Sequence, residues 1–137
     1  MTKKFWLAFV AVLIVDNLLS WLIYGMILGE QFRALPVWRP DMNSLQWIYF
    51  VISVVGSFFF TFIFSKGYEG KGILEGIRYG LYIGIWMSIG MAYGTYAMVA
   101  IPYGITLEWF LLGVASYVVL GIVVALVYGK KPAAPAA

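Results

Sequence analysis

Long stretches without a charged residue are the feature that most restricts what this chain can fold into. Three of them are bounded by Asp41 and Lys66, by Arg78 and Glu108, and by Glu108 and Lys130. A bilayer core of about 30 Å, crossed at 1.5 Å per residue, needs roughly 20 apolar residues, so each stretch can supply one membrane-spanning helix. A fourth stretch near the N-terminus is interrupted only by Asp16. The sequence therefore predicts an all-α integral membrane protein.

The four predicted helices form one transmembrane domain over residues 1–129, arranged as a compact up-down bundle. We expect the spans at residues 5–28, 45–65, 79–101 and 106–129. Strands are disfavoured because the uncharged runs are roughly two to three times the length of a membrane strand and show no alternation. Residues 130–137, rich in Pro and Ala, are expected to form a short tail with no fold of its own.

The basic residues indicate how the chain is oriented in the membrane. Of the nine Lys and Arg residues, only Arg33 and Arg39 fall on one side of the predicted spans, and the other seven fall on the opposite side. Because Lys and Arg accumulate in cytoplasmic loops, both termini are predicted to be cytoplasmic. The sequence thus predicts a multi-pass membrane protein. Nucleic acid is not an expected partner, since the basic residues are dispersed at helix ends.

The composition removes most of the usual chemistry of active sites. The chain has no Cys and no His, which excludes the common zinc, haem and imidazole chemistry. Its 64% hydrophobic and 11% charged residues also exclude an ordinary water-soluble domain, in which about 25% of residues are charged. We therefore expect no cofactor, no metal and no enzymatic activity. The lipid bilayer is the partner that the composition itself implies.

Asp16 is the charged residue predicted to lie deepest in the membrane. A carboxylate there costs about 2.5 to 3.5 kcal/mol on insertion scales, so other polar groups should surround it. Five residues of the first span fall within an arc of about 140° on a helical wheel, which predicts an inward polar face. These residues are Asp16, Asn17, Ser20, Trp21 and Tyr24. The candidate partners at similar depth are Ser53, Ser57, Ser88, Ser116 and Tyr117.

Two interpretations of this polar site stay open. In the structural interpretation, hydrogen bonds between helices fix how the helices pack, each worth about 0.6 to 2 kcal/mol. In the functional interpretation, Asp16 binds a proton or a cation in a transport path, which is the usual suspicion for an ionisable group within a membrane. The structural interpretation leads, because no second ionisable group lies at similar depth to receive a proton.

Small residues recur at a stride of four along the third predicted span. They are Gly72, Gly76, Gly80, Gly84, Ser88 and Ala92, and the fourth span repeats the pattern with Gly121, Ala125 and Gly129. Such ladders allow helices to approach closely, so we expect helix packing at Gly76, Gly80, Gly84 and Gly121. Gly90 and Gly94 lie on a separate face, which predicts that the third span packs against two neighbours.

Aromatic and charged residues mark the ends of the predicted spans. Trp6, Trp38, Trp47 and Trp109 fall at interface depths and are expected to be membrane anchors. At the cytoplasmic start of the third span, Lys71, Glu75 and Arg78 form a charged cluster. We interpret this cluster as a solvated helix end, with binding of an anionic lipid head group or of a partner as the alternative.

Two segments carry a resemblance to known families. Residues 17–29, NLLSWLIYGMILG, and residues 71–82, KGILEGIRYGLY, resemble an uncharacterised family of small four-helix bacterial integral membrane proteins, a domain of unknown function. Trp21, Tyr24 and Gly25 are part of the match. The resemblance implies the fold and the membrane location. It assigns no functional residue, because the family has no assigned activity. More loosely, a lone acid in the first of four short helices is similar to the small multidrug resistance transporters, in which that carboxylate exchanges protons for cationic drugs.

The leading functional hypothesis is an accessory or structural subunit that associates with itself or with other membrane proteins. It follows from dense helix-packing signals beside a near absence of reactive groups. The alternative is a small proton-coupled transporter or channel in which Asp16 is the coupling carboxylate. No feature of the sequence identifies a small-molecule substrate.

Overall fold

The computed structural model describes residues 1–132, and within that range the chain is built from helices. The elements are α1 (Lys3–Ser20), η1 (Trp21–Ile27), α2 (Gly29–Arg33), η2 (Met42–Leu45), α3 (Gln46–Gly67), α4 (Ile73–Met98) and α5 (Tyr103–Tyr128). Three stretches of the described chain are long and apolar enough to cross a membrane, namely Lys3–Ile27, Met42–Gly67 and Tyr103–Tyr128. α4 is as long as α5, at 26 residues each, but its many Gly and Tyr residues make it less apolar. These helices indicate a membrane protein.

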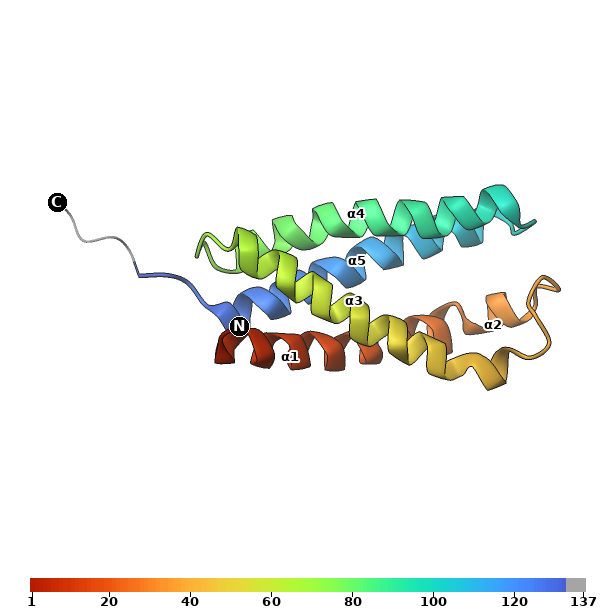
Figure 1. The fold of residues 1–137 in the computed structure, drawn as a ribbon. Helices are drawn as coiled ribbons and strands as arrows, with labels where there is room; N and C mark the ends of the chain where they lie inside the picture. Colours follow the sequence, from red (N-terminus) through yellow and green to blue (C-terminus); the bar gives the residue numbers. More distant parts are fainter. Residues whose placement is uncertain (133–137) are drawn as a thin grey trace.

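The helices do not form a closed four-sided bundle. α4 and α5 run side by side along their whole length, α5 also packs against α1, and α1 packs against α3 (Figure 1). The helices gather at the end that holds the N-terminus, which we call the terminal end, and α3 diverges from α4 toward the opposite, far end (Figure 1). The expected compact bundle is therefore open along the side between α3 and α4.

The first predicted span, residues 5–28, is not one regular helix. After Ser20 the chain widens into the π-helix η1, in which the Leu28 N–H donates to the Ile23 carbonyl at 2.7 Å. A wider turn changes which side chains face inward, and π-helical turns inside α-helices are uncommon. Here it brings Ile23 and Leu28 into a buried cluster with Ala92, Ile101 and Trp109. Hydrophobic periodicity assumes regular α-helical geometry, so it could not predict this change.

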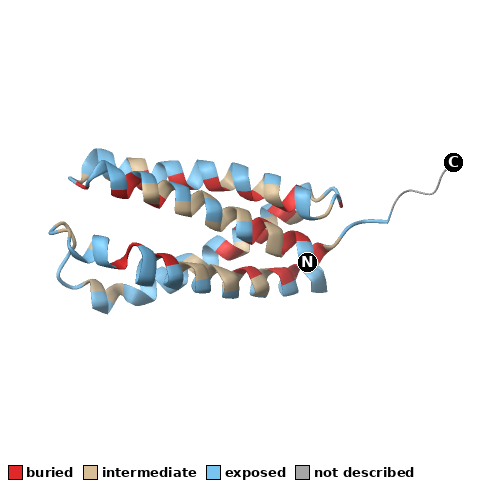
Figure 2. Ribbon diagram, turned by 180° about the vertical axis from the view of Figure 1, so that it is seen from behind, coloured by how far each residue is buried: buried red, intermediate tan, exposed pale blue. Residues whose placement is uncertain are grey.

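Two apolar clusters hold the helices together. Near the terminal end, α1, α3 and α5 contribute Ala8, Val12, Phe60, Phe64, Leu120, Val124, Ala125 and Tyr128. Near the far end, the cluster around Ile23 and Trp109 joins η1 to α4 and α5. Figure 2 shows the buried residues as narrow stripes on the facing sides of the helices, with the outer faces exposed. Broad exposed apolar faces are what a bilayer would cover.

Glycine lets α4 and α5 pack with their backbones in contact. A Cβ atom added at Gly76 would overlap the Gly121 carbonyl oxygen, and one added at Gly80 would overlap the Tyr117 carbonyl oxygen. Gly84 faces Val114 and the Tyr117 side chain. The face of α4 that carries Gly90 and Gly94 was expected to meet a second helix. A Cβ atom at either position would meet no atom within 4 Å. Within the described residues α4 therefore packs mainly on one helix, α5.

The start of the predicted tail is held in place. Gly129 has a φ of 74°, which turns the chain so that Lys130 pairs with Lys71 in an isolated antiparallel bridge. The Lys131 N–H then donates to the Gly70 carbonyl at 3.1 Å. Residues 130 and 131 of the predicted tail thus contact the loop between α3 and α4, and residues 133–137 lie outside the described part of the chain.

Candidate functional site

Asp16 and its neighbour Asn17 join α1 to α3 through one hydroxyl group. The Ser53 hydroxyl donates to the Asp16 carboxylate in a short hydrogen bond. The Asn17 side-chain amide donates to the same Ser53 oxygen at 3.0 Å and to the Leu13 carbonyl at 2.8 Å. We call Asp16, Asn17 and Ser53 the polar clasp. Hydrogen bonds of this kind fix the axial position of one helix against another.

The polar clasp lies at the edge of the molecule. Asp16 and Ser53 are half-buried, and Asn17 is exposed. The Asp16 carboxylate lines neither of two pockets at the terminal end, one between α3 and α4 and the other beside Lys130. Asp16 is instead enclosed in part by hydrogen-bonding groups. This geometry is the one expected for a structural polar contact between helices.

Two further hydroxyl groups continue from the polar clasp along α3. Ser57 and Thr61 follow Ser53 at a stride of four, so they lie on the same face of the helix. Ser57 is 4% exposed and Thr61 is fully buried, yet neither hydroxyl has a hydrogen-bond partner among residues 1–132. Buried polar groups without partners are rare in folded proteins. Sequence reasoning named Ser57 but missed Thr61, which the stride from Ser53 could have identified.

Of the remaining residues predicted for the polar site, Tyr24 and Tyr117 lie near enough to interact electrostatically with the Asp16 carboxylate. The Tyr24 hydroxyl accepts a hydrogen bond from the Trp109 indole at 2.7 Å. Ser88 is buried against Gly113, in the interface between α4 and α5. Tyr117 packs on Phe60. On the first span, Ser20 is half-buried and Trp21 is 66% exposed. The Ser116 hydroxyl donates to the Leu112 carbonyl of its own helix.

The predicted anchors divide into exposed and covered tryptophans. Trp6 and Trp47 are 50% and 63% exposed, so their indoles are accessible to lipid. Trp38 is half-buried and donates its indole N–H to the Phe32 carbonyl at 2.5 Å. Trp109 is only 9% exposed, because the Phe32 ring packs edge-on against it and Tyr24 accepts its N–H. Trp109 was expected to be an anchor at the membrane surface, but it is a core residue.

The charged cluster at the start of α4 is not a simple solvated helix end. Glu75 is 5% exposed, and its two carboxylate oxygens accept the backbone N–H groups of Glu69 at 2.6 Å and Lys71 at 2.8 Å. A carboxylate in the first turn of a helix also interacts favourably with the helix dipole. Glu75 therefore fixes the loop between α3 and α4. No pattern in the sequence predicts that the backbone of residues 69–71 folds back onto the first turn of α4.

Tyrosine and lysine side chains close the terminal end around the last carbonyls of α5. The Tyr68 hydroxyl donates to the Gly129 carbonyl at 2.5 Å, and the Lys4 ammonium donates to the Tyr128 carbonyl at 3.1 Å. The Lys131 ammonium lies over the Tyr68 ring, 4.7 Å from its centroid. Partial burial and the nearby Glu75 charge raise the pKa of Tyr68. The phenol thus stays a hydrogen-bond donor at neutral pH.

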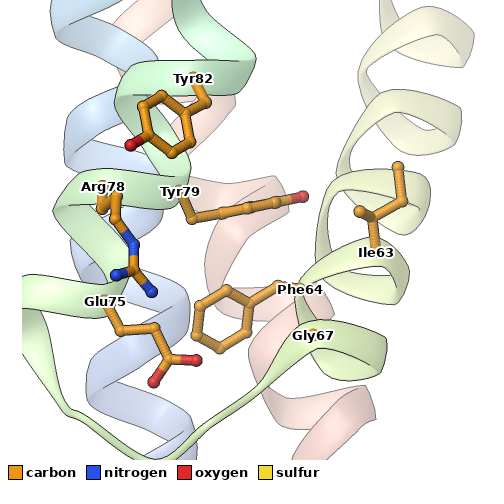
Figure 3. Close-up of a pocket in the computed structure, with 7 residues that line it drawn as sticks. All are labelled: Ile63, Phe64, Gly67, Glu75, Arg78, Tyr79 and Tyr82. Carbon is orange, nitrogen blue, oxygen red and sulfur yellow. The ribbon is translucent and has the colours of Figure 1, made fainter.

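A pocket of about 270 Å³ opens beside this cluster, between the end of α3 and the start of α4 (Figure 3). Its lining residues are Ile63, Phe64, Gly67, Glu75, Arg78, Tyr79 and Tyr82. Figure 3 shows the Arg78 guanidinium, on α4, extending down one side of this space toward the level of Glu75 and the Phe64 ring. The Tyr79 hydroxyl crosses toward α3 and donates to the Phe60 carbonyl at 2.6 Å.

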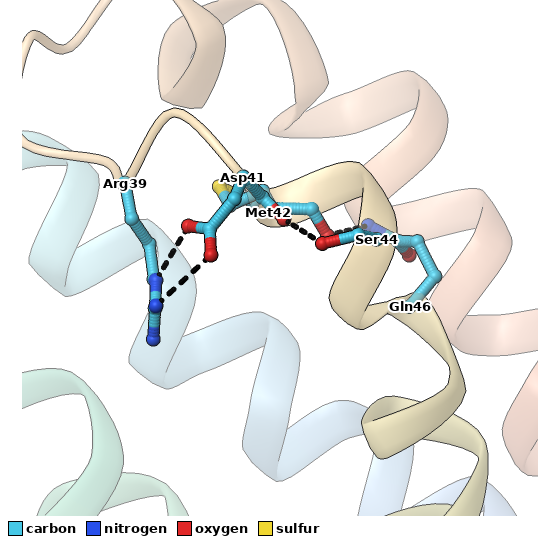
Figure 4. Close-up of polar contacts among 5 residues, drawn as sticks. All are labelled: Arg39, Asp41, Met42, Ser44 and Gln46. Carbon is cyan, nitrogen blue, oxygen red and sulfur yellow. Dashed lines mark hydrogen bonds and ion pairs between the residues drawn. The ribbon is translucent and has the colours of Figure 1, made fainter.

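The far-end loop before α3 is ordered by its own polar contacts. Arg39 and Asp41 form an ion pair with two hydrogen bonds, at 2.8 and 3.1 Å, and the Ser44 hydroxyl donates to the Asp41 carbonyl at 2.7 Å (Figure 4). Both charged side chains are more than half exposed. The pair orders the loop. Across residues 1–132, no group of acidic side chains is placed to hold a metal ion.

Comparisons of the chain with protein-family models, with curated proteins and with solved structures return no match. The resemblances to the uncharacterised four-helix family and to the small multidrug resistance transporters therefore stay predictions.

Proposed function

We propose that this chain is a four-span protein of a bacterial inner membrane, with both termini cytoplasmic, that acts as an accessory or structural subunit. The three apolar stretches supply three spans. α4 supports a fourth, because its backbone is in contact with that of α5 at Gly76 and Gly121 and the two helices are equally long. A helix packed in this way along a membrane-spanning helix crosses the same bilayer. The distribution of Lys and Arg supports the orientation.

The observation that carries the proposed role is the exposure of Asn17. This amide lies near the middle of the first span, on the outside of the chain, and Asp16 beside it is only half-buried. Polar side chains at that depth almost always face protein or water instead of lipid. Covering the polar clasp with a helix of another subunit removes this cost. The broad exposed faces of α1 and α3 supply the apolar surface around it.

Native mass spectrometry in mild detergent tests this proposal. We expect the wild type to be an oligomer, or to copurify in fixed ratio with another membrane protein, and we expect Asn17→Leu to shift the distribution toward the monomer. Thr95→Val is the matched control, because the Thr95 hydroxyl on α4 donates to a carbonyl of its own helix. A strictly monomeric wild type that copurifies with nothing would contradict the proposal.

A second candidate function is a proton-coupled transporter or channel, and the hydroxyl groups below Asp16 favour it. Ser53, Ser57 and Thr61 lie in line along α3, about 6 Å apart by helical rise, which is the spacing that single water molecules bridge. The two buried hydroxyls without partners would hydrogen-bond to such water. Protons would then pass between Asp16 and the terminal end.

Proteoliposomes that contain a pH-sensitive dye separate the two candidates. The transport function requires proton flux from the wild type and its loss in both Asp16→Asn and Thr61→Val. Ser116→Ala serves as the control, since that hydroxyl is bonded within α5. Equal flux from the wild type and Asp16→Asn rejects transport and leaves the structural role.

A further inference from the structure

We infer that the pocket between α3 and α4 at the terminal end binds the phosphate of an anionic phospholipid, with Arg78 as the phosphate ligand. The pocket has about 270 Å³, just below the usual range for small-molecule sites. That size suits a head group and the first part of an acyl chain, with the rest of the lipid in the bilayer. This inference does not depend on the role of the polar clasp.

Arg78 has the hydrogen-bonding capacity that such a ligand needs. Among residues 1–132 its charged partner is Glu69, and the two form an ion pair at 3.7 Å, which is longer than a hydrogen bond. The guanidinium therefore keeps its five N–H donors, in a planar arrangement that binds phosphate through two parallel bonds. About half of the side chain is exposed, so a ligand can reach it.

The acidic residues near Arg78 are already engaged. Glu75 lines the pocket, but its two carboxylate oxygens accept the backbone N–H groups of Glu69 and Lys71. The Glu69 carboxylate forms its short ion pair with Lys71. Glu75 is thus bound to the loop backbone, while the Glu69 carboxylate is shared between a short contact to Lys71 and a longer one to Arg78. A phosphate in the pocket would therefore compete only with this longer contact for the Arg78 guanidinium.

The walls of the pocket match the acyl part of a lipid. Ile63, Phe64 and Tyr82 give an apolar lining, and most of the exposed lining surface is apolar. The pocket lies where the long apolar helix α3 ends and α4 begins, which in the proposed four-span arrangement is the depth at which phosphates and the first carbons of acyl chains meet. Basic pockets between transmembrane helices on the cytoplasmic side are known sites for anionic head groups.

Native mass spectrometry of the full chain in mild detergent, with added phosphatidylglycerol or phosphatidylcholine, tests the inference. We expect one retained phosphatidylglycerol per chain and weaker retention of phosphatidylcholine. Arg78→Gln should weaken phosphatidylglycerol binding roughly tenfold or more, because hydrogen bonds to a charged group are lost. Gly67→Leu should also weaken it, since this side chain would occupy open space on the pocket wall while every charge is kept.

Lys130→Gln is the matched control, because it removes the same charge at the same end but from a different pocket. It should leave binding within about twofold, as expected for a charge that acts only from a distance. Circular dichroism and gel filtration establish that each variant is folded. If Arg78→Gln proves unstable, Arg78→Lys replaces it, and this variant should keep part of the wild-type affinity for phosphatidylglycerol. Three results would overturn the inference: equal retention of both lipids, unchanged binding in Arg78→Gln, or equal binding of soluble glycerol phosphate.

Discussion

Gly76 of α4 and Gly121 of α5 face each other so closely that a Cβ atom on either one would overlap the carbonyl oxygen of the other. The contact between the two helices is therefore backbone against backbone. Side chains can rotate to make room for a new methyl group, but the backbones of two packed helices cannot. The interface between α4 and α5 should tolerate no side chain at these two positions.

Replacing Gly76 by Ala should destabilise the protein, although Ala is the better helix former. We expect a loss of about 1 to 3 kcal/mol from overpacking, measured as a lower midpoint of thermal unfolding in detergent. Gly90→Ala on the same helix is the control, because its Cβ would meet no atom within 4 Å. That control should raise stability by roughly 0.5 to 1 kcal/mol through helix propensity. Equal effects at the two positions would disprove the close contact.

Removing the Ser53 hydroxyl should weaken the contact between α1 and α3. Ser53→Ala deletes the donor to Asp16 and the acceptor of Asn17, so we expect a loss of about 0.6 to 1.7 kcal/mol. The measurement is unfolding in mixed micelles with increasing SDS. Ser116→Ala makes the same chemical change at a hydroxyl that bonds only within its own helix, and it should have a smaller effect. A larger effect at Ser116 would contradict the role given to the polar clasp.

The Glu69 carboxyl group should titrate at unusually low pH. Its hydrogen bond and charge interaction with Lys71 lower the pKa of Glu69 below its ordinary value of 4.5, and Arg78 adds a smaller effect. Because the ionised form is favoured in the folded chain, the ion pair contributes fully above pH 4.5 and is lost as the pH falls through the lowered pKa. A ¹³C NMR titration of the Glu side chains measures this. Lys71→Gln should move the Glu69 pKa back toward 4.5, whereas an unchanged pKa in that variant would reject the ion pair.

The helical architecture was predictable, because uncharged runs of membrane length leave the backbone few other ways to satisfy its hydrogen bonds. The change to a π-helix at Trp21 was not, since it depends on how Ile23 and Leu28 meet α4 and α5. A periodicity of 3.6 residues, extended past that point, predicts an inward-facing position for Trp21, which is 66% exposed in the structure. Local pattern is reliable only where the helix stays regular.

The polar site was likewise predictable in part from the sequence pattern, and the rest of it depends on how the helices pack. The sequence places Asp16 and Asn17 inside a span, and the depth of the spans gives five candidate partners without distinguishing among them. The structure shows that Ser53 is the one hydrogen-bonded to both residues. The exposure of Asn17 could not be predicted, because it depends on α3 lying to one side of α1 and diverging from α4. Glu75 was misjudged for a similar reason: its partners are backbone N–H groups of a loop, which have no sequence signature.

That loop gives the last prediction. Glu75→Gln keeps the size of the side chain but replaces one acceptor oxygen by an NH₂ group, which cannot accept the N–H of Glu69 or Lys71. Hydrogen bonds to a charged group contribute about 1.5 to 3 kcal/mol, so the loop between α3 and α4 should open more often. Hydrogen exchange followed by mass spectrometry should show roughly tenfold faster exchange in residues 68–72.

The matched control is Glu108→Gln near the far end, where the carboxylate accepts one hydrogen bond from within residues 1–132, donated by the Gln31 side-chain amide at 3.1 Å. It should leave exchange in residues 68–72 unchanged, because the two ends of the bundle share no contact through that side chain. Exchange in α5 away from the loop should also stay slow in Glu75→Gln, since the apolar cluster around Leu120 and Val124 is intact. Faster exchange throughout the helices would mean that Glu75 stabilises the whole bundle instead of the loop, and unchanged exchange in the loop would mean that the carboxylate does not hold it.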